Sequence, residues 1–325
     1  TLITNTTIIL NVPSEAPLNA TDELRLKFKN GQEIVYDFEV RIPPPLINSM
    51  DLEFVDAGDI AVVNGNYFFD VTPVTVEFTS ASGRVAGEVV KTEDTRLEVI
   101  VPEDAITGPI YVTTNFGETE STLFFRDNRN IILNFDDKRS TGAWRTGTLA
   151  SADGLDGNYL LLKGELDANE RSEDYGGGGY VMQYWGQSSG APAGPFFDGV
   201  TDDYVLKFEA RILNWYGSYM NICFAPWDHK DSNQEYWSNS INARGIWGPW
   251  DVKDKNLQSN GWITVTIPMS EMRYAMGTEG GNVVYTDMKF DKAKTGSLAF
   301  WVIGSPKANN SPVEINIDNV RIVKK

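Results

Sequence analysis

The chain has 325 residues and a formal net charge of −17, from 45 acidic and 28 basic side chains. This balance argues against a nucleic-acid partner, because binding to phosphates depends on Lys and Arg replacing counterions. One cysteine and one histidine exclude an internal disulfide, a cysteine cage and a multi-histidine metal site. No run of about 18 apolar residues is present that could span a bilayer.

Short β runs fill the chain, and amphipathic helical patterns are almost absent. In the clearest run, alternate positions from Tyr204 to Ile212 are apolar, as in a strand with one buried face. Many short runs of this kind are separated by Gly, Asn, Asp and Pro. The sequence therefore predicts an all-β fold made of sandwiches.

Residues 1–42 precede three consecutive prolines, Pro43 to Pro45, which favour the stiff polyproline II conformation and cannot continue a ladder. The apolar content of this first segment is too low for an independent sandwich. We therefore expect residues 1–42 to be a partial immunoglobulin-like domain or the strands of a truncated spacer.

Residues 43–126 have the length of one immunoglobulin-like sandwich. A turn with Asn64-Gly65 divides two apolar runs, and a last strand ends at Phe125. Together with the phrases Val99–Pro102 and Thr107–Val112, this pattern resembles IPT/TIG immunoglobulin-like domains. The resemblance implies a spacer.

Residues 127–325 hold all nine tryptophans, and we expect a larger, jelly-roll-like sandwich here. An indole presents a flat apolar face on which the C–H face of a sugar can stack, while nearby amides and charged groups bond to the hydroxyls. Large aromatics on polar, turn-rich loops are typical of a binding face. The alternative for each ring is packing in the core.

The predicted site follows from this distinction. The residues expected to stack on successive sugars are Trp185, Trp215 and Tyr216. Further aromatic candidates are Tyr184, Trp227, Trp247 and Trp250. Polar contacts are expected from Gln183, Asn214, Asn221 and Arg244. Core positions are expected for Trp144, Trp262 and Trp301.

Other reactive groups are interpreted as solvated or inert, so no catalytic residue, cofactor or metal ligand is assigned. His229 is expected in a solvated loop, Gly176–Gly179 in a flexible loop, and Cys223 in a buried strand. The acids expected to be solvated are Glu165, Asp167, Glu170, Glu173, Asp174, Asp198, Asp202 and Asp203. A structural calcium ion between Asn134–Asp137 and Ile317–Val320 stays open as an alternative.

Three phrases of the last segment look like carbohydrate-binding sandwich modules: Ile132–Asp136, Gly261–Met269 and Ile315–Ile322. With the spacers and prolines before them, they are similar to the cell-surface glycan-binding proteins of Bacteroidetes polysaccharide-utilisation loci. The resemblance implies a non-catalytic outer-membrane lipoprotein with a xyloglucan- or β-glucan-binding module. It also implies a TonB-dependent transporter and a surface glycanase as partners. The lipidated cysteine of that family is not found, so a trimmed chain is expected.

The sequence thus predicts a monomeric protein that captures a plant-type or dietary polysaccharide, with xyloglucan or β-glucan favoured, through stacking aromatics. Two alternatives stay open. The first is a glycoside hydrolase or lyase that uses the acids around Glu165 or Asp198. The second is a structural or adhesion protein whose sandwiches bind another protein.

Overall fold

The computed structural model describes residues 2–4, 7–9, 23–37, 42–68, 73–167, 180–229, 242–279, 282–285 and 290–325. The chain divides into an N-terminal unit, Thr1–Asp127, and a C-terminal unit, Asn128–Lys325. In the described ranges, the helices are four 3-10 turns: η1 (Thr201–Asp203), η2 (Pro249–Val252), η3 (Met269–Glu271) and η4 (Lys292–Lys294). None of the described helices is long and apolar enough to cross a membrane. The predicted all-β fold is confirmed.

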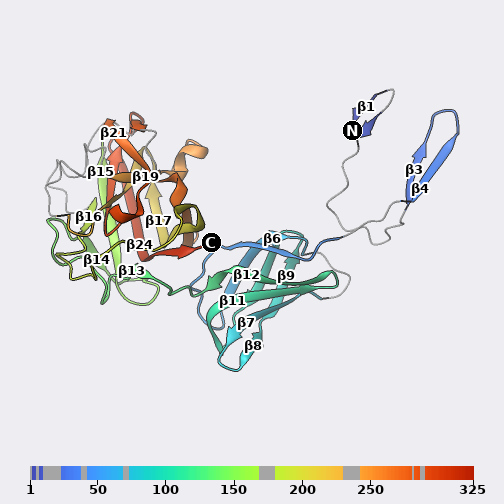
Figure 1. Ribbon diagram of the computed structural model, residues 1–325, viewed down its shortest axis with the longest axis horizontal. Coiled ribbons are helices and arrows are strands. Elements are labelled where there is room, and N and C mark those ends of the chain that lie inside the picture. The colour runs from blue at the N-terminus through green and yellow to red at the C-terminus, as the bar shows by residue number, and fades with distance from the viewer. Residues whose placement is uncertain are drawn as a thin grey trace. The chain divides into compact units, whose positions relative to one another are not determined.

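Two small antiparallel hairpins begin the N-terminal unit (Figure 1). Strands β1 (Leu2–Ile3) and β2 (Ile8–Ile9) form the first, and β3 (Glu23–Lys27) and β4 (Glu33–Asp37) form the second. Gly31 makes the second turn possible, because its φ of +84° is a conformation that glycine adopts readily. The apolar side chains of Val35 and Tyr36 are exposed on this hairpin.

Two four-stranded sheets form the immunoglobulin-like sandwich of the N-terminal unit. The first has the order β5 (Leu46–Met50), β6 (Ile60–Asn66), β10 (Arg96–Ile100) and β9 (Glu88–Glu93). The second has the order β12 (Gly117–Phe125), β11 (Ala105–Thr114), β7 (Thr75–Ser80) and β8 (Gly83–Ala86). Alternate residues of β6 and β11 are buried, so the period-two pattern builds the core between the sheets. Phe78 and Phe125 meet edge to face in that core, with ring centroids 5.0 Å apart.

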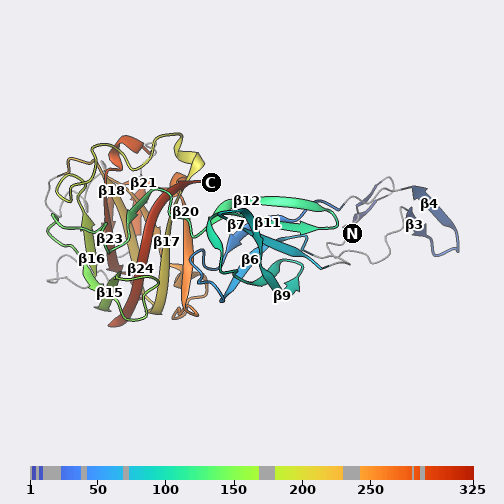
Figure 2. The same ribbon diagram turned by 90° about the horizontal axis from the view of Figure 1, so that it is seen from below.

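Two six-stranded sheets build the C-terminal unit (Figures 1 and 2). The β24 sheet has the order β14 (Thr148–Ala150), β15 (Tyr159–Leu166), β24 (Ser311–Lys324), β17 (Tyr204–Trp215) and β20 (Trp262–Pro268), with β13 (Ile131–Leu133) also paired to β24. The β16 sheet has the order β16 (Val181–Tyr184), β23 (Ser297–Gly304), β18 (Ser218–Ala225), β19 (Ala243–Trp247), β21 (Arg273–Glu279) and β22 (Asn282–Tyr285).

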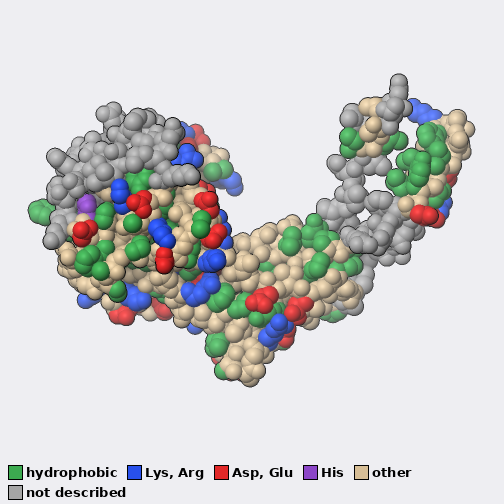
Figure 3. Space-filling view, in the orientation of Figure 1, with side chains coloured by type: hydrophobic (Ala, Val, Ile, Leu, Met, Phe, Trp, Pro, Cys, Tyr) green, Lys and Arg blue, Asp and Glu red, His purple; other side chains and the backbone are tan. Residues whose placement is uncertain are grey.

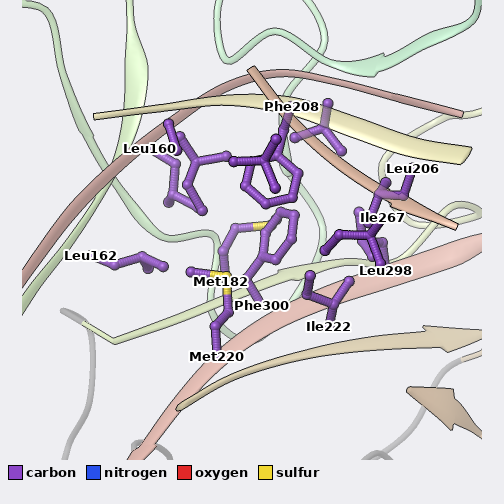
Figure 4. Packing of buried hydrophobic residues seen from close by; sticks show 14 of the residues in the cluster. Leu160, Leu162, Met182, Leu206, Phe208, Met220, Ile222, Ile267, Leu298 and Phe300 are labelled. Atoms are coloured by element: carbon purple, nitrogen blue, oxygen red, sulfur yellow. The ribbon is translucent and has the colours of Figure 1, made fainter. Parts of the chain in front are cut away.

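The main core lies between these two sheets. Leu160, Leu206 and Phe208 of the β24 sheet point toward Met182 and Phe300 of the β16 sheet (Figure 4). All five residues are fully buried. Burial of apolar area at about 25 cal/mol per Å² makes this layer the main source of stability for the unit.

The outer faces of both sheets are partly buried as well. On the β16 sheet, Val181, Cys223 and Trp301 belong to a second apolar cluster, separate from the main core. Trp301 is thus buried as expected, although outside the space between the sheets. On the β24 sheet, Arg321 and Glu209 form an ion pair at 2.8 Å with both side chains fully buried. Polar groups are therefore prominent on the outer face of the β24 sheet.

Candidate functional site

Three loops meet at one end of the C-terminal unit. Residues 140–147 lie along the β16 strand and the loop after it, because Gln183 N donates to Arg145 O at 2.7 Å and Thr141 N donates to Ser189 Oγ at 3.4 Å. The loop after β18 joins them, since Gln187 N donates to the carbonyl oxygen of Trp227 at 3.0 Å. Each segment carries one tryptophan. We call Trp144, Trp185 and Trp227 the tryptophan shelf.

Trp144 is 76 % exposed, more than any other aromatic residue in the described part of the chain. Its loop is nevertheless held in place, because Gly142 lies so near Ser188 that a Cβ there would be 2.3 Å from the Ser188 carbonyl oxygen. An exposed ring on a fixed backbone can accept a ligand at little conformational cost. The expectation that Trp144 packs in the core was wrong.

Trp185 lies at the end of β16 and is half-buried. It follows Val181 and Gln183 at period two, so its ring is on the outer side of the sheet, where it packs against the second apolar cluster. The ring of His229 meets Trp185 edge to face, with centroids 6.1 Å apart. The indole of Trp185 is thus backed by apolar side chains and stays partly accessible. His229 is 7 % exposed, which corrects its assignment as a solvated histidine.

Trp227 is half-buried and tightly positioned. Its Nε1 donates to Ala191 O at 3.0 Å, and Gly186 and Gly296 both lie against it. A Cβ at Gly296 would come within 2.5 Å of Trp227 Cβ. The three shelf residues thus come from different segments, and hydrogen bonds and glycine contacts fix their backbones relative to one another.

A second group of predicted rings lies at the β17–β18 turn. Trp215 and Trp250 are 0 % and 1 % exposed, and both Nε1 atoms donate to Ser218 O. Trp247 covers Trp215 edge to face at 4.9 Å, and Tyr216 covers Trp250 at 5.0 Å. The prediction that Trp215 and Trp250 stack on sugars is corrected, because their ring faces are covered by protein.

Tyr216 and Trp247 are half-buried members of this same group. The Tyr216 hydroxyl donates to Asp254 at 3.2 Å, and Trp247 also meets Phe208 edge to face at 5.2 Å. This group lies at the Ser218 end of β18, whereas Trp227 follows the other end, at Ala225. An eight-residue strand of about 23 Å therefore separates the group from the shelf. The predicted aromatic residues therefore lie in two separate groups and do not form one continuous row.

A charged network surrounds the second aromatic group. Lys307 Nζ donates to Asp251 and Asp254 at 2.9 and 3.0 Å, and the Tyr219 hydroxyl donates to Asp251 at 2.9 Å. The hydrogen bond from Lys307 lowers the pKa of both carboxyls. Burial, with the Asp251 hydrogen bond, raises the pKa of Tyr219 to about 12. The donors and acceptors satisfy one another, so this arrangement is a stabilising one.

The predicted polar contacts are mostly buried. The strand register places Asn221 opposite Trp301 and Arg244 opposite Cys223, on the outer face of the β16 sheet. Gln183, Asn221 and Arg244 are each 0 % exposed, so a sugar cannot reach them in this conformation. That part of the prediction is corrected. Asn214 is half-buried in β17 opposite Glu314, on the side of the second aromatic group.

Two further predicted positions have surroundings that the sequence did not reveal. Tyr184 is 7 % exposed with its ring in the main core, where burial raises its pKa, so its assignment to the site is corrected. Trp262, expected in the core, is half-buried, and its Nε1 donates to Asp153 O at 3.0 Å.

Among the described residues, the acids around Glu165 and Asp198 lack the surroundings of a general acid. Asp198 is exposed, and its hydrogen bond to Lys292 at 2.7 Å lowers its pKa, the opposite of what a general acid needs. Glu165, Asp167, Asp202 and Asp203 are exposed, as expected. Glu170, Glu173, Asp174, Trp237 and Gly176–Gly179 lie outside the described residues.

Known proteins of similar fold carry related domains. The family model for the surface glycan-binding protein B xyloglucan binding domain matches residues 125–324. Among solved structures, the surface glycan-binding protein PbSGBP-B from Prevotella bryantii is similar at 23 % identity and a TM-score of 0.71, over 96 % of this chain and 84 % of that chain. SGBP-B from a complex xyloglucan utilization locus in Bacteroides uniformis is similar at 22 % identity and a TM-score of 0.54, over 95 % and 82 %.

A structure solved with a xylogluco-oligosaccharide is similar at 19 % identity and a TM-score of 0.51, over 95 % of this chain and 65 % of that chain. No curated protein matches the chain. The solved structures, at these identities, establish the fold. The family model covers more than half of the chain and establishes a glycan-binding function at the cell surface. The chain therefore belongs to the family of surface glycan-binding proteins B, defined by their xyloglucan-binding domain.

Proposed function

We propose that the tryptophan shelf binds xyloglucan or a related β-glucan chain without cleaving it. The observation that carries this proposal is the 76 % exposure of Trp144, on a loop that hydrogen bonds fix beside Trp185. Hydrophobic side chains reach the surface of this unit among charged ones (Figure 3). A glucan presents the apolar C–H faces of its rings, and stacking on an aromatic ring contributes about 1–3 kcal/mol per ring.

The test is to replace Trp144 and Trp185 singly by Ala and to measure xyloglucan affinity by isothermal titration calorimetry. Each loss of one stacked ring should weaken binding by about 5- to 150-fold. Tyr216→Ala is the matched control, because this half-buried ring belongs to the second aromatic group. The proposal fails if both tryptophan variants bind like the wild type while Tyr216→Ala loses affinity.

Catalysis is the first rival, and its test is independent of affinity. The lowered pKa of Asp198 disfavours proton donation at neutral pH. We therefore expect no new reducing ends when the protein is incubated with a panel of polysaccharides. Sustained release of reducing sugar would establish an enzyme.

The second alternative is an adhesin that binds another protein. Retardation in native gels that contain xyloglucan, with free migration in gels without glycan, separates a glycan-binding protein from such an adhesin.

We propose further that the protein acts as a lipid-anchored monomer outside the outer membrane, next to a TonB-dependent transporter and a surface glycanase. The layout of immunoglobulin-like spacer and terminal glycan-binding domain supports this arrangement. Loss of the protein from intact cells on treatment with an external protease, together with its recovery in the outer-membrane fraction, would support the location. Co-purification of the transporter after crosslinking would support the partner.

A further inference from the structure

The outer face of the β24 sheet holds a buried polar group that the tryptophan shelf does not use. Asn316 and Asp318 are two residues apart on β24, so they share a face, and they are 3 % and 0 % exposed. Asp318 Oδ1 accepts the N–H of Asn319 at 2.7 Å. Asp318 Oδ2 and Asn316 Oδ1 have no hydrogen-bond partner among the residues that the structure describes. Buried acceptors without a donor are costly, because they lose hydration without compensation.

Other carboxylates surround Asp318. Strand β13 pairs with β24, with Leu133 opposite Val320. This pairing brings Asp136, three residues after Leu133, near the outer face of the β24 sheet. Asp136 and Asp156 lie near enough to Asp318 that their charges act on it together with that of Glu209, so several carboxylates share this part of the sheet. The Arg321 guanidinium donates to both oxygens of Glu209, at 2.8 and 3.0 Å.

The loop before β15 closes on Asp136. Asn158 donates to Asp136 Oδ1 from its backbone N at 3.0 Å and from Nδ2 at 2.7 Å. A Cβ at Gly157 would be only 2.5 Å from Asp136 Oδ2, so the backbone approaches this oxygen as closely as glycine permits. Asp136 is thus fixed through one oxygen, and hydrogen bonds between described residues leave the other available.

The polar atoms of Asp318, Asn316 and Asp136 that lack a described hydrogen-bond partner are oxygens. Oxygen ligands favour a hard cation. Ca²⁺ accepts six to eight oxygens from carboxylates, amide carbonyls and the backbone. No three Asp, Glu, His or Cys side chains of the described residues form a metal cage by themselves, so amide and backbone oxygens must complete the set. Mg²⁺ requires a stricter octahedral arrangement and fits such a mixed set less well.

We propose that Asp318, Asn316 and Asp136 bind one calcium ion, which ties the first segment of the C-terminal unit to its last strand. The cation would supply the partner that Asp318 Oδ2 and Asn316 Oδ1 lack. Its role is to stabilise the unit, since all three residues belong to the β24 sheet or its loops and none belongs to the tryptophan shelf.

The experiment compares thermal unfolding of the full chain in excess CaCl₂ and in EDTA. At a free calcium concentration of about one hundred times Kd, mass action should raise the melting temperature of the C-terminal unit by about 5–10 °C. Asp318→Asn should lose most of this shift. Asp202→Asn is the control, because it removes the same charge at an exposed position in η1 and should keep the shift.

Two further measurements keep the proposal falsifiable if Asp318→Asn does not fold. Asn316→Leu, which removes only the amide, should reduce the shift. Elemental analysis of the wild type after dialysis against calcium, followed by gel filtration, should find about one calcium per chain. Equal melting temperatures in CaCl₂ and EDTA, a calcium content near zero, or a response to magnesium alone would each overturn the proposal.

Discussion

Trp144 and Trp215 carry the same type of side chain but differ completely in solvent exposure. Trp144 is 76 % exposed, whereas Trp215 is fully buried and its Nε1 donates to Ser218 O at 2.8 Å. Removing a buried indole leaves a cavity, so Trp215→Ala should destabilise the C-terminal unit by about 3–5 kcal/mol. Trp144→Ala should change the free energy of unfolding by no more than about 0.5 kcal/mol.

Urea unfolding of the two variants measures this difference. The glycan affinity of Trp144→Ala is measured as well. This variant should bind glycan more weakly, while its unfolding curve matches that of the wild type. A Trp144→Ala variant that unfolds as readily as Trp215→Ala would show that the ring is part of the fold and not of a binding surface.

Tyr219 predicts a pH dependence of stability. Its pKa in the folded state, about 12, lies above the ordinary value of about 10, so the unfolded chain loses this proton first as pH rises. The contribution of Tyr219 to stability is therefore complete below about pH 10 and is lost between about pH 10 and 12. Tyr219→Phe should be less stable than the wild type at pH 8, because it loses the hydrogen bond to Asp251.

The stability gap between the wild type and Tyr219→Phe should narrow as pH rises from 8 to 11. Urea unfolding at both values, with each variant compared only with the wild type at the same pH, cancels the titration of other groups. A gap that stays constant would mean that the hydroxyl has no special partner in the folded protein.

Loops of the shelf are positioned by elements packed behind them. Gly296 lies immediately before β23, and a Cβ there would meet Trp227 Cβ at 2.5 Å and the Gly194 carbonyl oxygen at 2.6 Å. Gly296→Ala should therefore displace the Trp227 loop and weaken glycan binding by more than about fivefold. Gly261→Ala is a useful control, because no atom lies within 4 Å of its Cβ position, although its φ of +80° adds some strain.

Isothermal titration calorimetry with xyloglucan checks this prediction, with melting temperatures measured alongside. The expected pattern is a loss of affinity for Gly296→Ala and an affinity like that of the wild type for Gly261→Ala. Equal affinities for the two variants would remove Trp227 from the shelf.

The period-two pattern explains how much of the architecture the sequence could predict. Alternation from Tyr204 to Ile212 identified a strand correctly, but that strand continues through Trp215. The turn begins only at Tyr216, whereas Asn214 and Trp215 belong to the strand, so a core residue was assigned to the binding site. Exposure of Trp144 was missed for the complementary reason, since it depends on contacts between segments distant in sequence, such as Gly142 with Ser188.

The two units have separate apolar cores, one between the sheets of each sandwich. We propose that residues 43–126 act as a spacer and that residues 127–325 alone bind glycan, while the division at residues 42 and 43 stays a prediction. A fragment of residues 128–325 should then bind xyloglucan within about twofold of the full chain. Calorimetric titration of both proteins tests this, and a tenfold loss in the fragment would give the N-terminal unit a part in binding.

Cys223, fully buried in β18, is the one thiol of the entire chain. Maleimide reagents need an accessible thiolate and should leave the native protein unmodified. A cysteine introduced at an exposed site, such as Asn260, would then be the single point of attachment for a fluorophore, without any prior removal of native thiols. Single-molecule imaging of this protein on polysaccharide surfaces could therefore start from the natural sequence plus one substitution.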